Sequence, residues 1–123
     1  MATTEITGAN FQEIVQGDGI VVLDFWAEWC GPCKRFSPIF EQVSEEHPEA
    51  VFGKVDTEEN QELSAALQIQ SIPTLMLFRD GVLLARESGL LPAKALNELI
   101  AKAEELDMDE VRKQIEAEQA NEQ

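Results

Sequence analysis

The chain has 123 residues, with 24 acidic against 9 basic residues and a formal net charge of −15 at pH 7. This length suits a single domain with one hydrophobic core, and the hydrophobic content of 44% excludes a chain that is disordered throughout. The acidic balance argues against nucleic acid and against anionic membrane surfaces as partners, because both bind clustered Lys and Arg. Apolar runs stay far below transmembrane length; the longest, over residues 19–25, is interrupted by Asp24.

The first half of the chain predicts strands alternating with helices. A short strand near residues 5–6 precedes a helix over about 9–16, for which Thr7 is the expected N-cap. Residues 20–26 are apolar except for Asp24, which is typical of a strand covered on both faces. The helix expected over 30–46 has one apolar stripe along its length, as a helix packed on a sheet requires. That stripe consists of Phe36, Ile39, Phe40 and Val43.

The second half predicts a strand over 51–56 and a short helix over 59–66, followed by strands over 74–79 and 82–88. Asp80-Gly81 is a common tight-turn signal, so the last two strands form an antiparallel hairpin. A final helix opens at Pro92. The order of elements predicts an α/β fold with a central mixed β-sheet, in which a parallel core is joined by an antiparallel C-terminal hairpin and helices cover both faces.

The C-terminal segment differs in composition from the rest of the chain. Residues 104–123 hold eight acidic and two basic residues, a net charge of −6. Met108, Val111 and Ile115 form a short apolar row, and Asp107 with Glu110 resembles a capping box. We therefore expect a domain over 1–106 and an acidic extension over 107–123, with a short helix from 108 to about 117 that then frays. Three roles stay open for it: a solvated tail, a docking element for a partner, or packing against its own domain.

Both cysteines of the chain lie in Trp29-Cys30-Gly31-Pro32-Cys33, after a predicted strand and at the start of a helix. Unpaired N–H groups and the helix dipole at that position stabilise a thiolate, so we expect the pKa of Cys30 to fall below about 8.5. Cys33 lies one turn further into the helix. We therefore predict that Cys30 attacks disulfides and that Cys33 resolves the product. A disulfide that closes so small a ring stabilises the fold only a little and is better suited to carrying electrons.

Two further interpretations bear on this pair. Lys34 lies four residues after Cys30 and adds positive potential there, although an ordinary surface cation explains it equally well. The spacing between Cys33 and His47 is close to that of a zinc finger. A structural zinc site needs four Cys or His ligands, however, and two cysteines and one histidine supply only three. We expect no metal.

Asp24 is a costly residue for an apolar strand. It either points outward at an edge, bonds to backbone at the strand end, or is buried and has a raised pKa that suits proton transfer near neutral pH. It lies six residues before Cys30, which favours a place near Cys33. We predict Asp24 as a general base for the resolving step, with Lys54 on the neighbouring strand as its partner.

These residues together resemble the thioredoxin family over about residues 3–105. Trp-Cys-Gly-Pro-Cys followed some forty residues later by Ile-Pro-Thr is a specific signature. The resemblance rests on residues 24–34, Pro38, Lys54-Val55-Asp56, Ile72-Pro73-Thr74, Asp80-Gly81 and Gly89. It implies that Pro73 is cis and faces the cysteines, that Ile72 lends its backbone to an extended substrate segment, and that Trp26 packs beneath the site. It also implies an apolar substrate-binding surface of Trp29, Gly31, Pro32, Ile72, Pro73, Gly89 and Leu90.

The resemblance further implies a thiol-disulfide oxidoreductase that reduces protein disulfides and serves as a general electron donor. Its partners are a thioredoxin reductase and oxidised client proteins, and its redox centre is Cys30 with Cys33, without an organic cofactor. The N-terminus does not read as a signal peptide, so we expect a cytoplasmic protein. We also expect a monomer. The alternatives are a non-catalytic binding module with this fold and a disulfide oxidase or isomerase.

Overall fold

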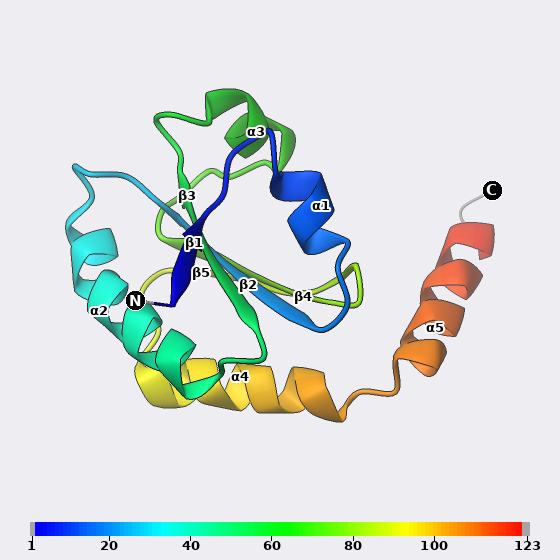
Figure 1. The fold of residues 1–123 in the computed structure, drawn as a ribbon. Helices are drawn as coiled ribbons and strands as arrows, with labels where there is room; N and C mark the ends of the chain where they lie inside the picture. Colours follow the sequence, from blue (N-terminus) through cyan, green and yellow to red (C-terminus); the bar gives the residue numbers. More distant parts are fainter. Residues whose placement is uncertain (1, 122–123) are drawn as a thin grey trace.

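The computed structural model describes residues 2–121, in which strands and helices alternate for most of the chain (Figure 1). The strands are β1 Thr3–Glu5, β2 Ile20–Trp26, β3 Val51–Asp56, β4 Thr74–Arg79 and β5 Val82–Ser88. The helices are α1 Phe11–Val15, α2 Gly31–Glu46, α3 Gln61–Ala66, α4 Ala93–Glu105 and α5 Met108–Asn121. No helix within residues 2–121 is both long and apolar enough to span a membrane.

The sheet has the strand order β1-β3-β2-β4-β5. β3 runs parallel to both β1 and β2, while β4 runs antiparallel to both β2 and β5. The turn between β4 and β5 is built by Asp80 and Gly81, which have φ angles of 52° and 83° and so suit a tight hairpin. The predicted mixed sheet with an antiparallel C-terminal hairpin is confirmed.

Helices cover both faces of this sheet, as predicted (Figure 1). On one face α2 and α4 pack against β2, β3 and β4, and on the other face α1 packs with the same strands. Since successive residues of a strand point to opposite faces, Val22 and Asp24 of β2 share the face that α2 covers. The first layer includes Val22, Phe36, Phe40, Val43, Phe52, Leu75, Leu77, Leu96 and Ile100; the second includes Phe11, Val15, Val21, Leu23, Phe25, Met76 and Phe78.

Helix α1 is shorter than the sequence predicts, and Thr7 is not its N-cap. The Thr7 backbone N–H donates to Asn10 Oδ1 at 2.7 Å, and Thr7 Oγ1 accepts the N–H of Ala9 at 3.2 Å. These local bonds form a turn in place of the first helical residues, so that Asn10 is the N-cap residue and the helix begins at Phe11. Helix α3 begins at Gln61 rather than residue 59 for a similar reason, since Asp56 Oδ1 accepts the N–H groups of Glu58 and Glu59.

Helix α5 extends to Asn121, beyond the predicted end near residue 117. Asp107 caps it as predicted, because its Oδ1 accepts the N–H groups of Asp109 at 3.1 Å and Glu110 at 3.3 Å. Met108 is 6% exposed, so the first turn of α5 packs against the domain. The end of the extension, residues 122–123, lies outside the described residues.

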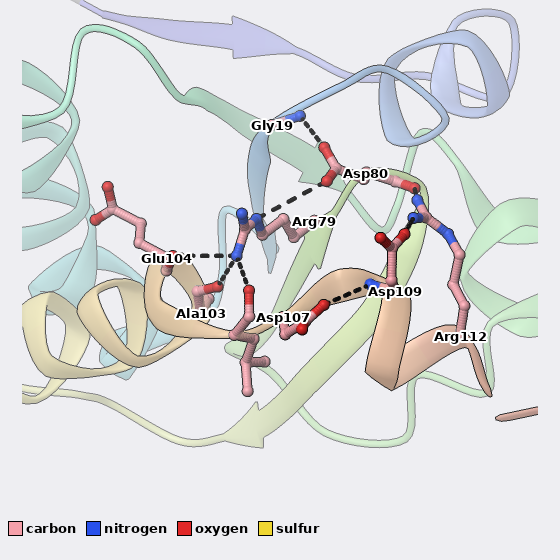
Figure 2. Close-up of polar contacts among 9 residues, drawn as sticks. Gly19, Arg79, Asp80, Ala103, Glu104, Asp107, Asp109 and Arg112 are labelled. Carbon is pink, nitrogen blue, oxygen red and sulfur yellow. Dashed lines mark hydrogen bonds and ion pairs between the residues drawn. The ribbon is translucent and has the colours of Figure 1, made fainter. Parts of the chain in front are cut away.

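Two arginines fix the junction between α4 and α5 (Figure 2). Arg79 Nη1 donates to the carbonyl oxygens of Ala103 at 2.7 Å and Leu106 at 2.8 Å, which satisfies carbonyls that the end of α4 leaves free. Arg112 of α5 donates to the carbonyl of Asp80 at 3.1 Å, at the tip of the β4–β5 hairpin. The extension is therefore attached to the sheet at its first two turns.

Candidate functional site

The two cysteines form a disulfide between the end of β2 and the first turn of α2, with their Cα atoms 5.2 Å apart. Cys30 is the N-cap of α2, and Pro32 lies in the first helical turn, where its missing N–H leaves no backbone bond unmade. Cys30 and Cys33 are 4% and 3% exposed, so overall exposure alone does not distinguish them. Gly31 and Pro32, between them, are exposed.

The backbone around Cys30 favours negative charge on its sulfur. Cys30 Sγ accepts the N–H of Cys33 at 3.2 Å, and the Cys30 carbonyl accepts the N–H of Lys34 at 3.2 Å as the first bond of the helix. An N–H donor and the positive end of the helix dipole both stabilise a thiolate at this position once the disulfide is reduced. The arrangement therefore matches the chemistry expected of Cys30 from the sequence.

A second loop lies against the cysteine pair. The peptide bond between Ile72 and Pro73 is cis, as the resemblance implied, and the Ile72 carbonyl oxygen lies 3.7 Å from Cys30 Sγ. The Gly89 N–H donates to the Pro73 carbonyl at 2.9 Å. These contacts bring three separate segments of the chain together around Cys30.

The residues expected to form the substrate-binding surface differ in exposure. Gly31, Pro32 and Gly89 are exposed, Trp29 is 69% exposed and Leu90 40%, Ile72 is half-buried, and Pro73 is buried. Pro73, one of the residues predicted for this surface, is therefore not itself exposed. Trp26 packs against Ala27, Cys30 and Cys33, which confirms its expected position below the site.

Glu58 is a residue of this region that the sequence did not reveal. Its Oε1 accepts the indole N–H of Trp29 at 2.6 Å, which orients the exposed ring beside Cys30. Glu58 follows β3 directly and Trp29 follows β2. A usable signal was the parallel pairing of these two strands, since the carboxyl ends of neighbouring parallel strands meet at one edge of a sheet.

Asp24 is fully buried in β2, between β3 and β4. Neither of its carboxylate oxygens has a hydrogen-bond partner within residues 2–121. An outward-pointing edge carboxylate and a backbone-bonded one, the two alternatives, are both wrong. Burial raises the pKa of Asp24 from 3.8 to about 7, and the positive charge of Lys54 acts in the opposite direction.

Lys54 lies opposite Asp24 in the parallel pair β2–β3. Its ammonium group donates to Ser37 Oγ at 2.7 Å and lies 5.2 Å from the centroid of the Trp26 ring. A hollow of about 780 Å³ beside α2 is lined by Cys33, Lys34, Ser37 and Lys54 among others. Both lysines singled out from the sequence thus face the hollow that reaches Cys33.

The residues 2–121 contain no group of three or more His, Cys, Asp or Glu side chains arranged to hold a metal ion. His47, considered above as a zinc ligand, is engaged elsewhere. Its Nε2 lies 2.7 Å from Asn97 Oδ1 of α4, and its ring stacks on Phe52. His47 therefore links α2 to α4 and does not join Cys33 in a site.

A disulfide-bonded cysteine pair at a helix N-terminus, beside a cis-proline loop on a mixed sheet, defines a thiol-disulfide oxidoreductase of the thioredoxin fold. The family model described as Thioredoxin matches residues 2–102. The chain is 50% identical over 119 residues to putative thioredoxin 2 of Streptomyces coelicolor, covering 97% of this chain and 89% of that protein. It is 42% identical over 101 residues to the thioredoxin of Alicyclobacillus acidocaldarius, covering 81% and 96% respectively. The chain belongs to the thioredoxin family.

Solved structures agree with this assignment. A mutant thioredoxin from Halobacterium salinarum superposes with a TM-score of 0.78 at 34% identity, covering 85% of this chain and 93% of that one. The thioredoxin of Plasmodium falciparum gives a TM-score of 0.74 at 37% identity, covering 81% and 98%. The similarity to the Streptomyces protein covers nearly the whole chain, whereas the family model ends at residue 102. The extension thus lies outside the family model, and the similarity to the Streptomyces protein reaches into it.

Proposed function

We propose that this protein reduces disulfides in other proteins by dithiol-disulfide exchange through Cys30 and Cys33. The observation that carries the proposal is the disulfide at the N-terminus of α2, where Cys30 Sγ accepts the N–H of Cys33. Only a thiolate attacks a disulfide sulfur, and this position stabilises a thiolate. The identity of this chain with proteins named thioredoxin supports the same activity.

In the first step the Cys30 thiolate attacks one sulfur of the client disulfide. A bond forms between Cys30 and that sulfur, the client bond breaks, and the other client sulfur leaves as a thiolate. In the second step Cys33, after losing its proton, attacks Cys30 and releases the second client thiol. Two electrons pass to the client, and the protein is left as the Cys30–Cys33 disulfide.

Asp24 is our candidate for the group that takes the Cys33 proton. A carboxylate with a pKa of about 7 is well matched to proton transfer near neutral pH. It lies on the sheet face that α2 covers, and α2 carries Cys33. Lys54 opposite Asp24 and Lys34 beside the cysteine pair are candidates for tuning these proton affinities.

Clients bind, in this proposal, on the surface formed by Trp29, Gly31, Pro32, Ile72, Pro73 and Gly89. The Ile72 carbonyl beside Cys30 suits pairing with an extended client segment, in the manner of an added strand. Selection by shape and backbone pairing suits a protein that must reduce many different clients.

A thioredoxin reductase returns electrons to the oxidised pair in this proposal, and the protein acts as a general electron donor in the cytoplasm. The cysteine pair is the whole redox centre, so we expect no bound cofactor or metal. We also propose that the protein works as a monomer and that residues 1–106 form the catalytic domain, with 107–123 as an extension to it.

The test is the reduction of insulin disulfides with dithiothreitol as the electron source. We expect the wild-type protein to accelerate the reaction, Cys30→Ser to abolish the acceleration, and Cys33→Ser to accumulate a mixed disulfide through Cys30. Full activity of Cys30→Ser would overturn the proposal. Measuring the reduction potential separates a reductant from an oxidase, because a potential well above that of the glutathione pool belongs to an oxidase.

A further inference from the structure

The ammonium group of Lys54 is held from helix α2 rather than by the carboxylate beside it. Lys54 Nζ donates to Ser37 Oγ at 2.7 Å and lies over the Trp26 ring. Asp24 is its direct neighbour across the β2–β3 pair, yet neither carboxylate oxygen has a hydrogen-bond partner in the described part of the chain. Among these contacts, the hydrogen bond to the Ser37 hydroxyl is the directional one, and it fixes the position of the Lys54 positive charge.

Ser37 is placed to link this charge to the redox centre. It follows Cys33 by four residues on α2, so the two side chains lie one turn apart on the same side of the helix. Cys33, Ser37, Trp26 and Lys54 all line the hollow of about 780 Å³ beside α2. Lys54 and Trp26 also line a second hollow of about 440 Å³ beside β1.

Many other charges face Lys54 from the elements around it. Carboxylates line both of the hollows that Lys54 lines, whereas Asp24 lies opposite Lys54 on the neighbouring strand. Asp24 is fully buried and lines neither hollow, whereas Cys33 lines the larger one. Besides Lys54, the charged groups that line the two hollows are Glu28, Lys34, Glu41, Glu45, Glu5, Asp56 and Glu59. A lysine released from Ser37 would turn toward these solvent-accessible carboxylates and away from the buried Asp24.

We propose that Ser37 is a positioning residue, whose hydroxyl holds the Lys54 ammonium group beside Asp24 and so sets the proton affinity of Asp24 for the resolving step. The part concerning the resolving step rests on the function proposed above. Three observations support this position of the Lys54 ammonium group: its hydrogen bond to Ser37, its strand register opposite Asp24, and the hollow that it shares with Cys33. The pKa of Asp24 supports it, since Lys54 is the charge that lowers this pKa.

Ser37→Ala removes the hydroxyl and leaves a good helix former, so the fold is retained. Lys54 then moves into the hollows, and the ionised form of Asp24 loses its cationic neighbour. An opposite charge within about 4–6 Å lowers a carboxyl pKa by roughly 1–3 units. Partial loss of that charge therefore raises the Asp24 titration midpoint by about one pH unit.

The experiment titrates Asp24 in the oxidised protein by carbon NMR, with ¹³C-labelled aspartate and Asp24→Asn to assign the signal. We expect the midpoint to rise in Ser37→Ala and to return toward the wild-type value in Ser37→Thr, which keeps a hydroxyl. The matched control is Ser44→Ala, because the Ser44 hydroxyl on the same helix donates to the Glu41 carbonyl and not to Lys54. Its midpoint should equal that of the wild type.

A Lys54→Met background shows whether Ser37 acts through the lysine. The midpoint should already be raised there, and adding Ser37→Ala should change it no further. An unchanged or lowered Asp24 midpoint in Ser37→Ala overturns the inference. An equal rise of the midpoint in Ser44→Ala also overturns it. So does a further rise when Ser37→Ala is added to the Lys54→Met background. Since this titration needs no client, it stands apart from the insulin assay, whose failure would contradict the proposed function alone.

A kinetic experiment measures the rate at which the mixed disulfide is released, as a function of pH. Ser37→Ala should shift the pH profile of the resolving step upward by about as much as the Asp24 midpoint, with Ser37→Thr restoring it. A change in rate without a shift in the profile would indicate a merely structural role for Ser37 and would contradict the assignment.

Discussion

At the scale of single residues, Asp24 is the one whose cost to the fold is largest. It is fully buried without a hydrogen-bond partner in the described chain, and burial raises its pKa from 3.8 to about 7. Between these two values the folded protein binds more protons at Asp24 than the unfolded chain does. Stability therefore falls as pH rises through this window and levels off above the folded-state pKa. Such an unfavourable burial is expected where the residue serves a reaction.

Asp24→Asn should therefore stabilise the oxidised protein in a pH-dependent way. At about pH 8 the free energy of unfolding should rise by roughly 2–4 kcal/mol, because the variant buries no charge; near pH 4 the change should be small, because Asp24 is then largely neutral in the folded state. Urea denaturation at both pH values measures this. An equal effect at the two pH values would show that Asp24 does not titrate as its burial implies.

At the scale of elements, β3 is tightly packed at Gly53. It pairs with β1 on one side and β2 on the other. At Gly53 an added Cβ atom would lie 2.8 Å from Leu23 Cδ2 and 2.9 Å from Ile6 Cδ1. The side chains of one core layer thus occupy the space that a larger residue would need.

Gly53→Ala should lower the free energy of unfolding by about 1–3 kcal/mol, because Ile6 and Leu23 must shift. Gly8→Ala is the matched control, since no atom lies within 4 Å of a Cβ atom added there. Thermal denaturation of both variants checks this. A Gly53→Ala protein as stable as the Gly8→Ala protein would show that this core layer accommodates a Cβ atom at residue 53 without strain.

Helix α5 lies far from the N-terminus of α2 (Figure 1). It is attached through the buried Met108 and through Arg112, whose bond to Asp80 is drawn in Figure 2. Truncation after Leu106 should leave insulin reduction intact, because the cysteine pair and the loops around it are untouched. Stability should fall by about 2 kcal/mol through the lost burial of Met108. A large loss of activity would place the extension within the catalytic domain and contradict its boundary at residue 106.

Apolar patterning sufficed to predict β2, β3, β4 and β5 with correct bounds, because each is a short apolar or alternating run between turn residues. It failed at the start of α1, where hydrogen bonds of Thr7 and Asn10 replace the first helical turn. The same patterning indicated that Asp24 lies in a strand covered on both faces, and its burial agrees with that prediction. The contact between Glu58 and Trp29 depends on which strands are neighbours, and periodicity along the chain holds no such information. The Ser37–Lys54 bond was missed for the same reason.

At the scale of the whole molecule, the proposed client surface is a small apolar one on a strongly acidic protein. A net charge of −15 disfavours self-association, which agrees with the proposed monomer. Trp29 and Leu90, at 69% and 40% exposed, supply apolar contact area beside Cys30. This combination suits brief encounters with many clients, in which the sulfur chemistry rather than a large interface determines the outcome.

The proposed exchange chemistry depends most on the acidity of the Cys30 thiol, and the pH dependence of its alkylation tests this directly. The fully reduced protein is treated with iodoacetamide over a range of pH, and mass spectrometry identifies the cysteine that reacts first. We predict Cys30, with a rate that reaches half its maximum well below pH ~8.5, the value of a free thiol. A midpoint at or above that value, or first reaction at Cys33, would contradict the account.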